Sequence, residues 1–459
     1  MGINDNFRYL SMGLPEDVLR LKYYGDFENA IRAIDRHLQA DSTPQAMKNC
    51  LTAQREIIRR LPDDYPYTKE AALALLREHV PGFPEAEFDA LRDARRIDWI
   101  YVRGIPHYFG RFLETLCKTD PLFAKRAGIA SAGADGQDGG TGRLDRAARL
   151  MRENGQMAAR IRCRASVRMK DALFCRGQRV RAYLPLPRAC AAQSGIRILN
   201  VFPQPSHISP ENAPQRVIFW EEDMEENHAF SVEFSLVRTA RYADLSRPAA
   251  ADGETPAADT EEQPPHILFT PYIRELTRVL GEGAEGPLKK ARRFYDFITE
   301  NVRYTFMPAY FGLENIPELG ARNLAGDCGV LALLFITLCR CAGIPARWES
   351  GWSAGPDFCG SHDWAQFYAP PYGWLYADPS FGAGAVRERN ETRRQHYFGN
   401  LDPYRMAANS LFQGEFDVPK DHWRADPYDN QVGEMETSDR GLHYDEYDRA
   451  KEVLEFTEL

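Results

Sequence analysis

The fold is decided by the stretch Gly326-Asp327-Cys328-Gly329 and the apolar run that follows it, Val330-Leu331-Ala332-Leu333-Leu334-Phe335-Ile336. The run stops at Gly343-Ile344-Pro345, and glycine followed by proline is a common way to end a helix. A helix that is apolar on nearly every side is typical of the centre of a domain. The sequence therefore predicts a buried helix that begins at Cys328.

Cys328 is a candidate nucleophile because of its place at the start of this helix. Unpaired backbone N–H groups and the positive end of the helix dipole stabilise a thiolate there. Gly326 and Gly329 flank it, which would let a substrate carbonyl approach the backbone, with the N–H of Cys328 as an oxyanion donor. A lone cysteine at a helix start is more often a packed small side chain. The assignment therefore depends on partners further along the chain.

Two such partners follow, His362 and Asp378. A reactive cysteine needs an imidazole to take its proton and a third group to orient the ring. Residues 362–368 and 374–378 are predicted strands, and 369–373, which contains two prolines and a glycine, is a predicted turn. We expect an antiparallel hairpin that brings the histidine and the aspartate together.

The register of this hairpin decides whether the two side chains can meet. If Tyr368 faces Tyr372 across the turn, His362 lies directly opposite Asp378. If Ala369 faces Gly373 instead, His362 and Asp378 lie diagonally on one face of the sheet. A shift of one residue would place them on opposite faces. We predict an even register, with the His362 and Asp378 side chains hydrogen-bonded.

The motifs together resemble the core of the transglutaminase-like superfamily. The resemblance rests on Gly-Asp-Cys-Gly before the apolar helix, the sequence Cys-Arg-Cys-Ala-Gly-Ile-Pro-Ala-Arg at 339–347, His362-Asp363-Trp364, and Gly-Trp-Leu-Tyr-Ala-Asp-Pro at 373–379. It is strong over about residues 290–385. It implies a papain-like fold with Cys328 as nucleophile, His362 as base and Asp378 as the orienting residue.

The chain departs from the family pattern in three respects. Bacterial members commonly have alanine where this chain has Asp363, an acid that can compete for the imidazole. The second oxyanion donor is not identified, and Tyr304, Asn323 and Trp364 are the candidates. The calcium sites of animal transglutaminases are not recognisable.

Composition limits the other functional classes. No apolar run approaches the ~20 residues of a membrane span, no basic stripe suits nucleic acid, and the N-terminus lacks the features of a secretory signal. Nine cysteines, an odd number, are typical of reduced thiols. No pair of CxxC motifs points to zinc. We expect a cytoplasmic protein with no cofactor, no metal, no nucleic acid and no membrane segment.

The wider pattern predicts an α+β protein of several domains. Helical periodicity with proline breaks precedes residue 129, and the alternation typical of short strands follows. Residues 401–459 carry 15 acidic and 6 basic residues, so the charge of this segment equals the net charge of the whole chain, −9. The predicted parts are a helical N-terminal domain of four to six helices (1–129), a flexible linker (130–145), an antiparallel β-sandwich (146–246), a disordered connector (247–265), the transglutaminase-like catalytic core (266–430) and an acidic C-terminal segment (431–459).

The resulting hypothesis is a cysteine-dependent hydrolase or acyltransferase that acts on peptide or related amide bonds through an acyl-enzyme, most simply a peptidase or amidase. Its substrate would be a peptide or protein, and the helical N-terminal domain could bind a protein partner. Two alternatives stay open at this stage. One is a protein-glutamine amine transferase, and the other is a non-catalytic scaffold with the same fold.

Overall fold

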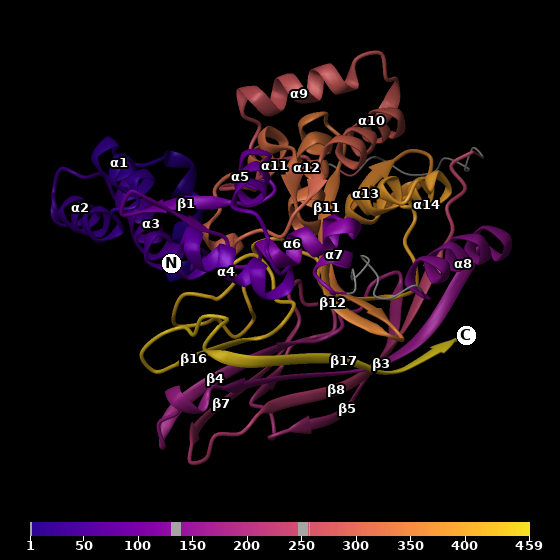
Figure 1. Ribbon diagram of the computed structural model, residues 1–459. Coiled ribbons are helices and arrows are strands. Elements are labelled where there is room, and N and C mark those ends of the chain that lie inside the picture. The colour runs from indigo at the N-terminus through magenta and orange to yellow at the C-terminus, as the bar shows by residue number, and fades with distance from the viewer. Residues whose placement is uncertain (1, 130–138, 247–255, 257) are drawn as a thin grey trace.

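A computed structural model describes residues 2–129, 139–246, 256 and 258–459 of the chain. Figure 1 shows the N-terminal helices on the left, a layered pair of sheets at the bottom and a mixed core above them on the right. This arrangement confirms the predicted α+β class. It also shows that a mixed core of helices and a sheet is combined with N-terminal helices and antiparallel sheets.

The core is a five-stranded sheet with helices around it. Its strand order is β14-β13-β12-β11-β15. The strands are β11 (Ala346–Gly355), β12 (Phe358–Ala369), β13 (Gly373–Ala377), β14 (Phe398–Gly399) and β15 (Arg405–Asn409). The helices are α9 (Pro271–Gly281), α10 (Gly286–Asn301), η3 (Tyr310–Gly312), α11 (Ile316–Asn323), α12 (Cys328–Cys341), α13 (Pro379–Arg387) and α14 (Glu391–His396).

Helix α12 is the buried helix that the sequence predicts. It begins at Cys328, and the side chain of Asp327 caps it by accepting a hydrogen bond from the Val330 N–H at 3.3 Å. The helix lies against the sheet, where the ring of Phe335 meets Phe367 of β12 with centroids 5.5 Å apart. Because α12 is enclosed on nearly all sides, its N-terminal cysteine has a fixed position relative to β12.

The hairpin register is one of the two even registers predicted. β12 and β13 pair from Ala369↔Gly373 to Ala365↔Ala377. His362 and Asp378 lie just beyond the last of these pairs. They are therefore diagonal neighbours rather than directly opposite each other.

The β-sandwich has two four-stranded sheets, ordered β16-β4-β7-β6 and β17-β3-β8-β5. Its strands are β3 (Gln156–Met169), β4 (Gln178–Pro185), β5 (Gln193–Phe202), β6 (His207–Ile208), β7 (Val217–Met224), β8 (Phe230–Arg241), β16 (Glu434–Thr437) and β17 (Tyr447–Glu458), with the short helix η2 (Asp171–Leu173) after β3. Figure 1 shows the yellow β17 running along the magenta β3. The predicted separate C-terminal segment, 431–459, is thus wrong, because it supplies one strand to each sheet.

Charge complementarity explains why the acidic end of the chain pairs with β3. Glu452 pairs with Arg164 across the two strands, and Asp448 pairs with Arg168. The Arg164 Nη1 lies 3.1 Å from the Glu452 Oε1. Opposite charges on facing positions favour this pairing, whereas like charges would oppose it.

The N-terminal domain contains more elements than the four to six helices predicted. They are η1 (Ile3–Met12), α1 (Glu16–Tyr24), α2 (Phe27–Gln39), α3 (Gln45–Asp64), α4 (Lys69–His79), α5 (Glu85–Asp93), β1 (Trp99–Val102), β2 (Ile105–Tyr108), α6 (Phe112–Thr119) and α7 (Pro121–Arg126). The domain contacts the core, since the Phe306 N–H donates to the Thr115 Oγ1 of α6 at 3.2 Å.

The two predicted linkers lie partly outside the described residues, namely 130–138, 247–255 and 257. For the rest of the first linker, residues 139–145, the prediction of a flexible loop is wrong, because α8 (Gly139–Asn154) begins there. The end of the second connector is packed against the core: the Gln263 side chain donates to the Phe412 carbonyl at 2.6 Å. The short strands β9 (Arg303–Tyr304) and β10 (Ala325–Gly326) pair in parallel and lead into α12.

Removal of β17 should destabilise the sandwich. A chain that ends at residue 446 loses Tyr447, which is buried, and exposes the edge of β3. We expect the free energy of unfolding of the sandwich in urea to fall by about 3 kcal/mol or more. A chain that ends at residue 458 is the matched control and should unfold like the full chain. Equal stability of the two shortened chains would contradict this account.

Candidate active site

The candidate nucleophile Cys328 lies at the first position of α12, as predicted, and is partly buried. The two flanking glycines also have a packing role. A Cβ at Gly326 would overlap the Val330 side chain, and one at Gly329 would overlap the Tyr310 hydroxyl. Their small size is therefore needed for packing of the protein's own side chains.

His362 and Asp378 form the hydrogen bond that the hairpin register predicts. The His362 Nε2 lies 2.7 Å from the Asp378 Oδ2, and both side chains are buried. The imidazole also packs on Phe381 of α13, with ring centroids 4.6 Å apart. The other oxygen of Asp378 accepts from the Phe381 N–H at 2.9 Å and so caps α13.

Arg405 is the residue of this cluster that sequence reasoning missed. It belongs to β15, is fully buried, and its Nη1 lies 2.7 Å from the Asp378 Oδ2. Its Nη2 lies 2.8 Å from the Asp402 Oδ2. Nothing local in the sequence shows that β15 joins the far edge of the sheet.

The charges in this cluster fix the protonation states of the ring and the carboxyl group. Burial alone would raise the pKa of Asp378, but His362 and Arg405 outweigh it and hold that pKa at about 2. Burial lowers the pKa of His362 below its usual value, although Asp378 opposes this effect. An ionised Asp378 can only accept, so the Nε2 of a neutral ring carries the hydrogen and the Nδ1 is free to accept a proton.

The Cys328 thiol contacts Asp363 rather than His362. Its Sγ donates to the Asp363 Oδ2 at 3.2 Å. Cys328 and His362, both among the described residues, are not hydrogen-bonded to each other. Neighbouring residues point to opposite sides of a strand, and Asp363 shares its side of β12 with Phe367, which packs under α12. The competing acid expected from the sequence is thus in contact with the thiol itself.

Of the three candidates for a second oxyanion donor, only Tyr304 stays close to Cys328 and uncommitted. The Trp364 Nε1 donates to the Glu349 Oε2 at 2.6 Å. Asn323 is exposed at the end of α11. Tyr304 is paired with Gly326, and burial together with the charge of Cys328 raises its pKa well above the usual value.

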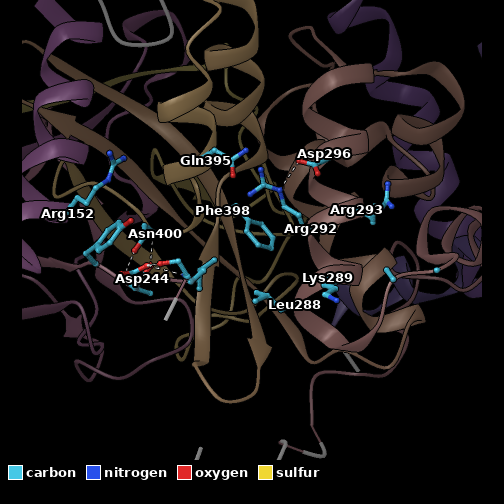
Figure 2. Close-up of a pocket in the computed structure, with 16 residues that line it drawn as sticks. Arg152, Asp244, Leu288, Lys289, Arg292, Arg293, Asp296, Gln395, Phe398 and Asn400 are labelled. Atoms are coloured by element: carbon cyan, nitrogen blue, oxygen red, sulfur yellow. Dashed lines mark hydrogen bonds and ion pairs between the residues drawn. The ribbon is translucent and has the colours of Figure 1, made fainter. Parts of the chain in front are cut away.

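A separate hollow of about 710 Å³ lies between α8, α10 and the strand β14. Figure 2 shows Arg152, Lys289 and Arg293 around it, with Phe398 on its wall. None of the three predicted catalytic residues lines this hollow. Within the described ranges, no group of three or more His, Cys, Asp or Glu residues is arranged to hold a metal ion, and no described helix is long and apolar enough to cross a bilayer.

These features define an α+β protein in which helices surround a five-stranded core sheet. Residues 274–379 match the model of the transglutaminase-like superfamily. No curated protein matches the sequence.

Two solved structures are similar to the chain at low identity. A candidate cysteine protease from Cytophaga hutchinsonii is 14% identical, with 65% of this chain and 91% of that chain covered and a TM-score of 0.43. The periplasmic domain of TgpA from Pseudomonas aeruginosa is 19% identical, with 54% and 97% covered and a TM-score of 0.28.

Substitution of Arg405 should show how strongly the His362–Asp378 pair depends on it. Arg405→Met leaves two buried carboxylates without their cation, and breaking a buried ion pair typically costs about 3–5 kcal/mol. We expect a loss of that size in the free energy of unfolding measured in urea. Arg405→Lys, which keeps the charge, is the control and should lose less. A loss below about 1 kcal/mol in Arg405→Met would contradict the role assigned to this arginine.

Proposed function

We propose that the protein is a cysteine-dependent hydrolase that cleaves peptide or related amide bonds through an acyl-enzyme on Cys328. The observation that carries the proposal is the buried hydrogen bond of 2.7 Å between His362 and Asp378. Cys328, at the start of the central helix α12, contacts Asp363, which follows His362 in β12. In this proposal Asp378 fixes the tautomer in which the Nδ1 of His362 accepts a proton.

The proposed reaction has two stages. The Cys328 Sγ passes its proton to the Nδ1 of His362 and forms a bond to the substrate carbonyl carbon, while the N–H of Cys328 and the hydroxyl of Tyr304 donate to the oxyanion. His362 then gives the proton to the leaving nitrogen as the C–N bond breaks. In the second stage water attacks the thioester carbonyl carbon and gives a proton to the Nδ1 of His362. The C–S bond then breaks, His362 returns this proton to the sulfur, and the carboxylic acid leaves.

Before the first step the thiol has to exchange Asp363 for His362 as its partner. Catalytic hydrogen bonds often reach their final geometry only when substrate binds.

The acceptor of the acyl group separates the candidate functions. Water makes the protein a peptidase or amidase, which we propose, and an amine makes it a transglutaminase. The calcium sites of animal transglutaminases are not recognisable in the sequence, which favours water. A non-catalytic scaffold would need neither the buried His362–Asp378 pair nor a cysteine at the head of α12. We place the reaction in the cytoplasm, where the nine thiols would stay reduced, and keep the helical N-terminal domain as the candidate surface for a protein partner.

A library of peptides and amines tests the proposed activity directly. The wild type should release shortened peptides with new carboxyl ends, detected by mass spectrometry, and Cys328→Ala should release none. Peptide–amine adducts as the main product would select the transglutaminase instead. If the folded wild-type protein gives no product with either water or an amine, the non-catalytic scaffold is the remaining function.

The pH dependence follows from the lowered pKa of His362. A neutral ring is the working base, so kcat/KM for a peptide cleaved in that library should fall as the pH drops through the pKa of His362. Because burial lowers this pKa, the midpoint should lie below 6.5. Asp378→Asn should reduce the rate by about 10³–10⁴-fold because the ring can adopt the wrong tautomer. An acid midpoint clearly above 6.5 would contradict the assignment of His362 as base.

A further inference from the structure

The carboxyl group of Asp363 is held against the Cys328 thiol by a residue from a distant part of the chain. Its Oδ2 accepts from the Cys328 Sγ at 3.2 Å, and its Oδ1 accepts from the Gln431 Nε2. Gln431 is itself fixed, because its backbone carbonyl accepts from the Trp352 Nε1 at 2.6 Å. Asp363 is only 6% exposed. It can turn away from the thiol only by losing a buried hydrogen bond.

Two further carboxyl groups lie close to this contact. Asp327 caps α12 one residue before the cysteine, and Asp429 shares the Gln431 amide with Asp363. Burial and the charges of Asp429 and Asp327 raise the pKa of Asp363 well above its usual value. Burial and the charges of Asp363 and Asp327 likewise raise the pKa of the Cys328 thiol.

The remaining titratable and charged groups come from four other elements. Lys118 of α6 lowers the pKa of Cys328, and Arg111, just before α6, acts with Lys118 on Asp327 in the same direction. Burial lowers the pKa of Lys451 in β17 to about 8, although the charges of Asp429 and Asp363 oppose this shift.

Two phenols complete these surroundings. Tyr304 of β9 and Tyr310 of η3 both have pKa values raised by burial and by the nearby acids, so they stay neutral. The Tyr310 hydroxyl donates to Asp327. Asp327 is thus engaged by Tyr310 and by the start of α12, whereas one oxygen of Asp363 is directed at the sulfur.

We propose that Asp363 holds Cys328 as a neutral thiol and thereby sets the pH at which this cysteine becomes reactive. An ionised carboxylate accepts the S–H hydrogen bond, but a thiolate 3.2 Å away would bring two negative charges together in a buried site. The cysteine loses its proton readily only when Asp363 is neutral or when substrate separates the two groups. The inference rests on the proposed function only in taking Cys328 as the nucleophile.

The test is the pH profile of Cys328 alkylation by iodoacetamide, followed by peptide mass spectrometry in the full chain. Asp363→Asn removes the charge and keeps the shape, so the midpoint should move to lower pH. For each unit of that shift the amount of thiolate at pH 7 rises tenfold and its nucleophilicity falls, so the alkylation rate should rise about threefold. Asp363→Glu keeps the charge and should retain the wild-type midpoint. The exposed Cys175 in the same chain is the internal reference.

The outcomes separate this inference from the proposed function. An unchanged or higher midpoint in Asp363→Asn would overturn the inference, and Asp363→Ala, which also removes the charge, supplies the same test if the asparagine variant does not fold. His362→Ala is run alongside. If Asp363→Asn shifts the profile and His362→Ala does not, the control by Asp363 stands and the role of His362 as base fails. If only His362→Ala shifts the profile, the role of His362 as base stands and the control by Asp363 fails.

Discussion

The candidate site depends on one buried carboxylate, that of Asp378. Burying an unpaired charge is costly, so the surrounding structure has to supply partners for it. The imidazole of His362, the guanidinium of Arg405 and the backbone N–H of Phe381 all lie within 3 Å of its oxygens. These partners come from β12, β15 and α13. The same carboxylate therefore joins the hairpin to the far edge of the sheet and begins the next helix.

The thiol has the opposite electrostatic surroundings. Acidic side chains from α12, β12 and the segment before β16 gather around Cys328, and the nearest cations come from the N-terminal helices and from the last strand. The His362–Asp378 half of the proposed site is thus preorganised, and in our proposal Asp363 keeps the Cys328 thiol protonated. Such an arrangement limits alkylation and oxidation of the thiol, since the thiolate is the reactive form.

Sequence reasoning succeeded where the signal is local. The apolar run after Cys328 predicts α12, and the turn between two short strands predicts the register that joins His362 to Asp378, because both depend on residues close together in the chain. It could not identify Arg405, whose strand reaches the sheet only through tertiary contacts. It also treated the acidic end of the chain as a separate segment, although the arginines of β3 carried the complementary charge.

The position of Asp363 shows a different limit. The sequence shows an acid beside the histidine, but alternation along β12 gives the two side chains opposite directions, and the path of α12 decides which of them meets the sulfur. That path depends on the packing of the whole core. The packing role of the glycines around Cys328 could not be predicted for the same reason, since the side chains they accommodate, Val330 and Tyr310, are identified only by the three-dimensional structure.

The central claim is that Cys328 carries the acyl group, and brief treatment with p-nitrophenyl acetate followed by peptide mass spectrometry tests it most directly. The account predicts a rapid burst in which one acetyl group is attached to Cys328, with none at that position in Cys328→Ala and a much slower burst in Asp378→Asn. Acetylation of Cys328 no faster than that of the exposed Cys175 would contradict the claim.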